Sequence, residues 1–270
     1  MNTIERQMVE ILVDLKTRHH VIGVKAEFEA EGTRLEEAMR LKEVISAAQL
    51  GLTLKIGGCE AIRDMYEARI LGVSRIVAPM VETPYALKKF LAAIKLSFPE
   101  DERGQIKFAI NIETVTAWKN LDEMLALPQI KELDGVVIGR VDMSGSIGLN
   151  RDDVNGEDIF EITKDIVTKT YAKGLITAIG GGVSADTLSF LRRMPKNSIN
   201  YYETRKVIFE CPGALSGGSE EGVLKAVYFE LLWLKNKRDF YGTIFKEDEK
   251  RIEMLEARYT SAMEKYGIIR

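Results

Sequence analysis

The chain has 270 residues, 46% hydrophobic and 29% charged, a composition typical of a globular protein with a sizeable core. Its net charge of −3 provides no basic field for nucleic acid or an anionic membrane, so we expect neither partner. Cys59 and Cys211 lack metal-type spacing and indicate reduced thiols in a cytoplasmic protein. No apolar run approaches the length of a membrane span, and residues 1–20 lack the apolar core of a signal peptide.

The predicted elements alternate between short apolar strands and longer amphipathic helices. Residues 1–20 carry an apolar stripe of helical spacing and predict an N-terminal helix. Strands are predicted at 21–28, 52–57, 74–81, 106–113, 134–141, 175–181 and 198–204. The intervening helices are predicted at 35–50, 59–71, 84–97, 115–132, 157–173 and 185–194. This repeating unit favours a (β/α)8 TIM barrel over residues 21–220, with a doubly wound open sheet as the alternative.

The last part of the chain is less regular than the barrel pattern. Only the seven strands above are clear, so we expect the eighth to be irregular, near residues 207–213, or displaced by the N-terminal helix. Residues 221–270 predict a helical extension that breaks near Tyr241 and Gly242. An appended amphipathic helix packs either on its own barrel or on a neighbouring subunit, and the pattern does not choose between them.

Two of the predicted strands end on a carboxylate, Glu113 in "INIET" and Asp142 in "GRVDMSGS". Because the C-terminal ends of barrel strands meet at one mouth, these acids could approach each other closely. Two anions repel unless one is protonated or a cation lies between them. Oxygen ligands without a nearby histidine or cysteine favour a hard cation, Mg²⁺ or Mn²⁺. The structural alternative is that Glu113 caps a helix and Asp142 holds a loop.

Other charged and glycine residues follow the predicted strands. Lys55 closes the second strand and could balance a substrate carboxylate or enolate, or pair with an acid of the rim. Glu27, Glu29 and Glu31 lie at the end of the first strand, where Glu27 and Glu29 alternate onto one side; one of the three could reach the mouth, and the others indicate a solvated face. Gly181, in "AIGGGVS", permits close approach of a ligand to the backbone. Arg205 follows the seventh strand and indicates either an anion clamp or surface charge.

Residues 110–149 closely resemble the HpcH/HpaI aldolase and citrate lyase β-subunit family. The family's "QIET", "xNLDEIL" and "DGVFIGPxDLSxSLG" segments correspond here to "NIET", "WKNLDEML" and "DGVVIGRVDMSGSIG". The earlier segment "RIVAPMVETPYA" matches the family's "LLVPMVExxxxA" strand. Agreement runs from Val21 to Gly182 and is weak in the last third of the chain.

The resemblance implies a pyruvate/phosphoenolpyruvate-type TIM barrel in which Glu113 and Asp142 bind a divalent metal. It also implies that the backbone at Gly139, Arg140 and Val141 holds the carboxylate of a 2-oxo acid. Family members make or break a carbon–carbon bond next to an enolate that the metal stabilises. Family habit further implies a homo-oligomer, a trimer or a hexamer.

Three positions depart from the family pattern. Lys55 stands where the family has a catalytic arginine, which keeps the charge and loses the bidentate fork. The histidine of the family's "DGEH" motif has no counterpart in "KAEFEAEG". Arg140 replaces the proline of "IGPxD", so it either reads a second anionic group of the substrate or pairs with Glu113 or Asp142 in place of the metal.

We therefore expect a divalent-metal-dependent carbon–carbon lyase of the class II aldolase type, acting on a 2-oxo acid such as pyruvate and on a polar aldehyde. Lys55 would stabilise the enolate, and Glu27, Glu29 or a metal-bound water would transfer the proton. Arg140, Arg205 or Lys206 would recognise the aldehyde. Two alternatives are a CoA-thioester lyase of the citryl or malyl type, and a non-catalytic barrel that lost the catalytic arginine and histidine.

Overall fold

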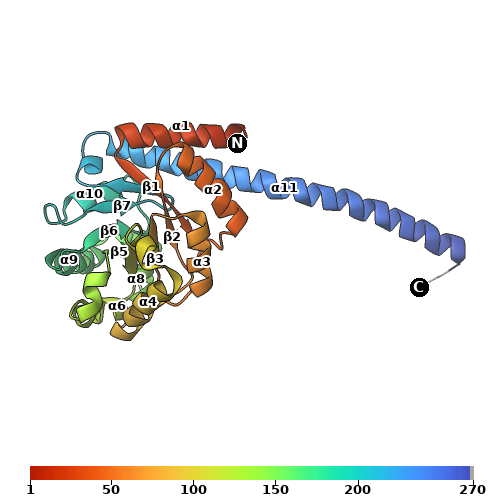
Figure 1. Ribbon diagram of the computed structural model, residues 1–270. Helices are drawn as coiled ribbons and strands as arrows, with labels where there is room; N and C mark the ends of the chain where they lie inside the picture. Colours follow the sequence, from red (N-terminus) through yellow and green to blue (C-terminus); the bar gives the residue numbers. More distant parts are fainter. Residues whose placement is uncertain (268–270) are drawn as a thin grey trace.

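The computed structural model describes residues 1–267 and shows a closed barrel of eight strands in sequence order, with one long helix running off it (Figure 1). The strands are β1 (Val21–Glu27), β2 (Gly51–Lys55), β3 (Arg75–Ala78), β4 (Lys107–Ile112), β5 (Gly135–Gly139), β6 (Ile176–Gly180), β7 (Tyr201–Glu203) and β8 (Val207–Glu210). The predicted barrel is therefore confirmed, and the open sheet is excluded because β8 closes the ring against β1.

The eighth strand runs in the opposite direction to both of its neighbours. Strands β1 to β7 pair in parallel, whereas β8 is antiparallel to β7 and to β1. Only residues 204–206 separate β7 from β8, and a parallel return needs a crossover of about a dozen residues or more. A hairpin therefore replaces the last β/α unit, which is the irregular strand expected near residues 207–213.

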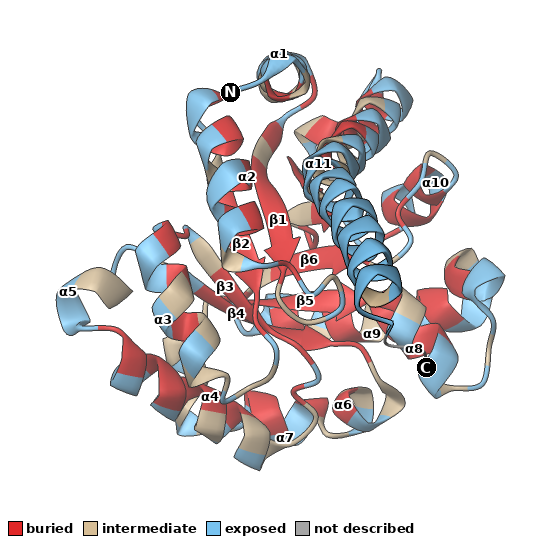
Figure 2. Cartoon of the chain, turned by 90° about the vertical axis from the view of Figure 1, so that its right-hand side faces the viewer, coloured by how far each residue is buried: buried red, intermediate tan, exposed pale blue. Residues whose placement is uncertain are grey.

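Helices cover the outside of the barrel, with their buried faces on the strands and their exposed faces in solvent (Figure 2). The α-helices are α1 (Thr3–Arg18), α2 (Leu35–Ala47), α3 (Ile62–Leu71), α4 (Pro84–Ser97), α5 (Glu100–Arg103), α6 (Val115–Lys119), α7 (Leu121–Leu125), α8 (Arg140–Ser146), α9 (Glu157–Ala172), α10 (Thr187–Arg192) and α11 (Ser219–Tyr266). Short 3-10 helices are η1 (Pro128–Glu132), η2 (Arg151–Asn155) and η3 (Gly213–Leu215). Both faces of the strands are thus buried, as their near-continuous apolar sequences require.

The helix predicted at 115–132 consists of three shorter pieces, α6, α7 and η1. Asn120 lies at the first junction, and Pro128 begins η1 because proline has no N–H to continue the preceding helix. The strand predicted at 134–141 also ends early, at Gly139, where the chain turns directly into α8. These differences move Asp142 from a strand end into the first turn of a helix.

Helices α1 and α11 lie side by side and run in opposite directions (Figure 1). Asn2, at the start of α1, donates from Nδ2 to Asn236 Oδ1 at 2.7 Å, whereas Arg18 at its end lies 3.5 Å from Glu221. The direction of α11 follows from β8. Because β8 returns to the end of the barrel where β1 begins, α11 starts at that end and then passes the rim of the mouth.

Helix α11 is continuous, so the predicted break near Tyr241 and Gly242 is wrong. Glycine inside a helix costs about 1 kcal/mol relative to alanine, which does not end a helix with good helix formers on both sides. Its packing on the rest of the chain depends on buried residues in its first third, namely Val223, Ala226, Phe229 and Trp233. Of the predicted extension 221–270, the last three residues lie outside the described part. None of the helices in residues 1–267 is both long enough and apolar enough to cross a membrane.

Candidate active site

The mouth of the barrel contains a buried cluster of charged side chains. Side chains two residues apart on a strand point to the same face, so alternate residues of each strand end converge inside the barrel. Buried charges are tolerated only when they are paired or hydrogen-bonded. The members, each at most 8% exposed, are Lys25, Glu27, Lys55, Glu113, Glu203 and Lys206.

Glu113 follows β4 directly and is 1% exposed. Its Oε1 accepts from the Met80 N–H at 3.0 Å, and its Oε2 accepts from Asn111 Nδ2 at 2.6 Å. Lys55 Nζ lies 3.4 Å from the same Oε2. Burial nevertheless raises the pKa of Glu113, and the charge of Asp142 acts in the same direction, against the opposing effects of Lys55, Asn111 and Met80. The carboxylate therefore has less positive charge around it than its burial requires.

Asp142 lies in the first turn of α8 and is exposed at the rim. It comes three residues after the end of β5, which pairs with β4, so the two predicted acids follow neighbouring strands. Gly139 makes this approach possible, because a Cβ there would lie 2.6 Å from Glu113 Oε2. The two carboxylates are near enough for the charge of Asp142 to influence the pKa of Glu113.

Lys55 is held between two acids. It ends β2, and its Nζ lies 2.9 Å from Glu29 Oε2 as well as 3.4 Å from Glu113 Oε2. The contact with Glu29 is an ion pair with poor hydrogen-bond geometry, since Glu29 Oε2 has no hydrogen-bond partner within the described residues. Burial would lower the pKa of Lys55, but the charges of Glu113 and Glu29 raise it. Lys55 is therefore a fixed cation that pairs with acids of the rim, which is the alternative expected for it.

Lys25, Glu27 and Glu203 form a second ion cluster, in which Lys25 is the residue that sequence reasoning missed. Lys25 Nζ lies 2.6 Å from Glu203 Oε1 and 3.1 Å from Glu27 Oε1. Burial would lower the pKa of Lys25, but the two acids outweigh it and raise the pKa. Burial would raise the pKa of Glu27, but Lys25 lowers it. Both predicted proton carriers are therefore ion-paired, Glu27 with Lys25 and Glu29 with Lys55, and Glu29 is the more exposed of the two, at 26% against 10%.

The hairpin between β7 and β8 carries two cations that are already paired. Lys206 forms an ion pair with Glu31, and Arg205 Nε lies 3.0 Å from Glu31 Oε1. Glu230 of α11 is 3.9 Å from Arg205, and burial raises its pKa although Lys206 and Arg205 oppose the shift. The predicted anion clamp therefore faces acids of its own chain. Sequence reasoning missed Glu230, because only the reversed β8 brings α11 to this rim.

Arg140 does not point into the mouth. It is fully buried, and its guanidinium donates to the carbonyl oxygens of Gly180, Gly181 and Val154 at 3.1, 2.9 and 3.2 Å and to Asn155 Oδ1 at 2.8 Å. Burial lowers the pKa of Arg140 to about 9, so it stays charged at neutral pH. Neither expected role of Arg140, reading a substrate anion or replacing the metal, fits this position. It instead joins the loop after β6 to η2.

Gly181 is required for the packing of the same loops. Its φ is +76°, and a Cβ there would lie 2.6 Å from the backbone N of Arg140 and 2.7 Å from that of Val141. The loop after β6 therefore lies directly against the start of α8. This contact fixes the backbone at Arg140 and Val141, the segment expected to hold a substrate carboxylate.

The paired acids fit a divalent cation with few protein ligands. Within residues 1–267, no three His, Cys, Asp or Glu side chains gather in a metal-binding group. Glu113 and Asp142 would therefore leave most coordination positions to water and substrate, which is common for Mg²⁺. Asn111 Oδ1 is buried beside Glu113 and has no hydrogen-bond partner in the described part of the chain. Because buried acceptors normally have partners, this atom supports a ligand at the site.

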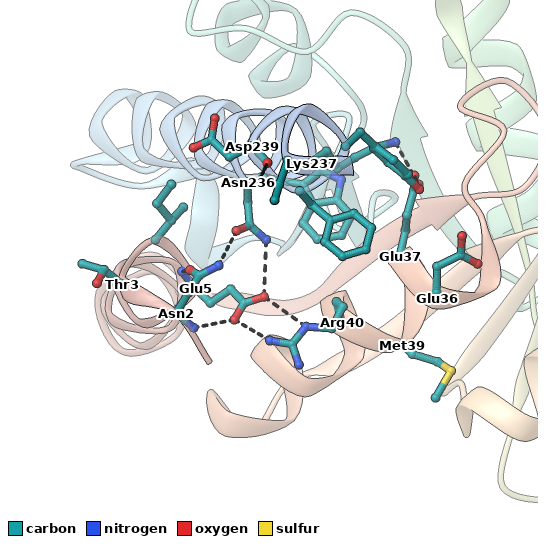
Figure 3. A pocket seen from close by; sticks show the side chains of 15 residues that line it. Asn2, Thr3, Glu5, Glu36, Glu37, Met39, Arg40, Asn236, Lys237 and Asp239 are labelled. Carbon is teal, nitrogen blue, oxygen red and sulfur yellow. Dashed lines mark hydrogen bonds and ion pairs between the residues drawn. The ribbon is translucent and has the colours of Figure 1, made fainter. Parts of the chain in front are cut away.

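A separate groove of about 810 Å³ lies between the starts of α1 and α2 and the middle of α11 (Figure 3). Its polar wall is a network around Glu5, which accepts from the Asn2 N–H at 2.7 Å and from Arg40 Nε at 3.1 Å. Asn236 Nδ2 adds a contact at 3.3 Å to the same carboxylate. None of the predicted site residues lines the groove. Its hydrogen bonds instead fix α11 where the helix leaves the barrel.

The closed barrel with acids at the strand ends places the protein among TIM-barrel proteins with a candidate metal site. More specifically, the chain belongs to the HpcH/HpaI aldolase/citrate lyase family, whose model matches residues 39–187. The matched segment includes Lys55, Glu113 and Asp142 but excludes Glu27 and Glu29. The family is of the aldolase and citrate lyase type.

Solved structures of low sequence identity share the fold. A HpcH/HpaI aldolase/citrate lyase family protein from Burkholderia cenocepacia J2315 is 13% identical with a TM-score of 0.58, over 70% of this chain and 80% of that one. The HpcH/HpaI aldolase from Desulfitobacterium hafniense DCB-2 is 12% identical with a TM-score of 0.58, over 73% and 81%. The citrate synthase SbnG is 16% identical with a TM-score of 0.57, over 86% and 90%. The comparison with curated proteins gave no match.

Proposed function

We propose that the protein is a divalent-metal-dependent carbon–carbon lyase that forms or cleaves a bond to pyruvate or a related 2-oxo acid. The observation that carries this proposal is that Glu113 and Asp142 follow adjacent strands, where burial and the charge of Asp142 raise the pKa of Glu113. Mg²⁺ or Mn²⁺ held by these acids would supply the positive charge that stabilises an enolate. Membership of the family supports aldolase-type chemistry.

Lys55 and Glu29 are the residues best placed to act on the substrate. The Lys55 ammonium would balance the carboxylate or the enolate oxygen of the 2-oxo acid, as a point charge without the bidentate geometry of arginine. Glu29, at 2.9 Å from Lys55, would move the proton at the carbon next to the carbonyl. Its Oε2 is the oxygen without a hydrogen bond in the described residues. Binding of an anion by Lys55 would weaken the Lys55–Glu29 pair and free this carboxylate.

The second substrate, a polar aldehyde, would bind toward the β7–β8 hairpin. Arg205 is the more accessible cation there, with 47% of its side chain exposed. An anionic group on the aldehyde would have to compete with Glu31 for this arginine. The hairpin therefore favours aldehydes with a charged or strongly hydrogen-bonding group.

Calorimetric titration of Mn²⁺ into the full chain, with and without oxaloacetate, tests the proposal. Wild type is expected to bind Mn²⁺ more tightly when the 2-oxo acid is present. Substituting a residue that only holds a metal ligand in place already lowers metal affinity by about 10-fold or more. Glu113→Gln and Asp142→Asn remove the proposed ligands themselves, so each is expected to lower the affinity for Mn²⁺ by more than about 10-fold. Asp152→Asn, an exposed acid of η2, is the control and should bind as wild type.

Two results would contradict the proposal. If wild type binds no Mn²⁺ under either condition, the metal-dependent mechanism fails and the non-catalytic barrel becomes the better reading. If both variants bind like wild type, the metal site lies elsewhere and the roles of Glu113 and Asp142 are wrong.

A further inference from the structure

One face of α11 carries a continuous heptad repeat, which we call the α11 seam. Its first positions are Leu224, Leu231, Arg238, Phe245, Ile252 and Tyr259. Its second positions, each three residues later, are Val227, Leu234, Tyr241, Asp248, Leu255 and Ala262. Apolar residues at alternating steps of three and four over this many heptads are the sequence pattern of a coiled coil.

The α11 seam is exposed. Leu224 is 63% exposed, Phe245 63% and Leu255 55%, and within the seam only Tyr241 is partly covered, by a hydrogen bond from its hydroxyl to Glu37 Oε1 at 2.6 Å. The buried residues of α11 lie on a different face, and the second half of the helix extends beyond the barrel (Figure 1). An exposed apolar stripe of this length on a protein surface indicates an interaction site.

We propose that the α11 seam pairs with the seam of a second copy of this chain in an antiparallel coiled coil. In such a coil each first-position residue of one seam packs against a second-position residue of the partner's seam, and each of these pairs forms one layer of the interface. One register places Leu231 against Leu255 of the partner subunit and Arg238 against Asp248 of the partner subunit. The two-fold axis repeats each pair, so both charged seam residues are neutralised and the other layers are apolar.

A parallel coil in register is disfavoured by the same residues. It would place Arg238 against Arg238 of the partner subunit and Asp248 against Asp248 of the partner subunit, two layers of like charge. Like charges in a desolvated layer repel strongly. In the single chain Arg238 pairs with Asp239 at 2.8 Å. This pair is exposed, so replacing it by a pair with Asp248 of the partner subunit costs little free energy. The charged seam residues therefore select the antiparallel arrangement.

The residues beside the seam are compatible with this register. Lys235 would face Glu249 of the partner subunit, which is an attractive pair. Lys237 would face Arg251 of the partner subunit, but Lys237 is already paired with Glu37 of its own barrel at 2.8 Å. The interface would be roughly 60 Å long at 1.5 Å per residue, with a two-fold axis near residue 243 and the two barrels toward opposite ends.

Cysteine cross-linking tests the arrangement in the full chain. In a Cys59→Ser/Cys211→Ser background, Leu231→Cys and Leu255→Cys are made singly and together. The antiparallel coil predicts a disulfide-linked dimer from the double variant and none from either single variant. A covalent dimer from a single variant overturns the antiparallel direction. If no variant cross-links and wild type sediments as a monomer, the pairing itself is overturned.

Charge exchange tests the register independently. Arg238→Asp and Asp248→Arg alone are each expected to weaken dimerisation by about 10-fold or more, because each creates layers of like charge. The double exchange Arg238→Asp/Asp248→Arg should restore the dissociation constant to near the wild-type value. Lys250→Asp, on the opposite side of the helix, is the matched control and should have no effect. If the single exchanges leave the dissociation constant unchanged, the proposed register is wrong.

Discussion

Lys25 shows how single residues set the electrostatics of the mouth. Its ammonium pairs with both Glu203 and Glu27, which come from the last parallel strand and the first. A buried ion pair adds little net stability compared with an apolar pair, but a buried charge left without its partner is costly. The consequence of a substitution here therefore depends on which partner is removed.

Lys25→Met is expected to destabilise the fold by about 3–5 kcal/mol, because it leaves two buried carboxylates unpaired. Urea unfolding of the full chain measures the change. Lys107→Met is the control, since Lys107 is 56% exposed and pairs with Asp134 at 2.8 Å, and such surface pairs contribute about 0–1 kcal/mol. Equal costs for the two variants would show that the Lys25 cluster is solvated.

Glu113→Gln is expected to stabilise the metal-free protein at neutral pH. The raised pKa of Glu113 means that the folded state binds this proton more tightly than the unfolded chain does. The stability that this tighter proton binding contributes is present below the pKa of Glu113 in the unfolded chain. It is lost as the pH rises through the pKa of Glu113 in the folded protein. Glutamine cannot ionise, so the variant avoids the loss. Thermal unfolding in EDTA should show a stability difference that grows from about pH 4 to about pH 7; a variant less stable than wild type at the higher pH contradicts this.

At the scale of elements, the junction of β5 and α8 positions the site. The chain passes from strand to helix without a loop at Gly139, and the helix carries Asp142 in its first turn. The absence of a side chain at Gly139 lets Glu113 lie against β5. This junction, more than either acid alone, determines the distance between the two carboxylates.

Gly139→Ala is expected to displace Glu113, since the new Cβ would lie 2.6 Å from Oε2 and 2.7 Å from the Cβ of that residue. Overpacking of this kind costs about 1–3 kcal/mol, and Mn²⁺ affinity should fall with it. Gly145→Ala in α8 is the matched control, because a Cβ there meets no atom within 4 Å. Thermal unfolding and Mn²⁺ titration of both variants make the comparison; similar behaviour would mean that Glu113 adapts without loss.

At the scale of the whole molecule, the reversal of β8 determines the path of the last helix. In a regular barrel a helix would descend from the rim after the eighth strand. Here α11 ascends instead, contributes Glu230 to the rim and continues beyond the barrel. The same helix therefore has a barrel-facing side and a free seam.

Two alanine variants test the two sides of α11 separately: Phe229→Ala changes the barrel-facing side, and Leu231→Ala changes the seam. Phe229 is fully buried, so its truncation is expected to cost about 3–5 kcal/mol in unfolding free energy at any protein concentration. Leu231 is 44% exposed in the single chain, so its truncation should change monomer stability by less than about 0.5 kcal/mol while weakening the dimer. Unfolding at low and high protein concentration distinguishes the two; a concentration-independent effect of Leu231→Ala contradicts the seam.

Local patterns in the sequence were sufficient for the barrel, and they placed Glu113 and Asp142 after two neighbouring strands. Strand and helix periods, and the motifs around Glu113 and Asp142, depend on residues a few positions apart. The three-residue link between β7 and β8 could also have predicted the reversed strand, because no crossover fits in it. The predicted break at Gly242 failed because a single glycine weakens a helix without ending it.

The direction and partner of each charged side chain were decided only by the tertiary structure. Lys25 and Glu203 are 178 residues apart in sequence and meet because the barrel closes. Arg140 is held away from the other charges because carbonyl oxygens of Gly180, Gly181 and Val154 converge on its guanidinium. Periodicity specifies which face a residue occupies on its own element, whereas a buried charge is stabilised by groups from other elements. The sequence by itself thus determined the order of the elements and the acids that follow β4 and β5, and ring closure with a reversed last strand determined which charges meet.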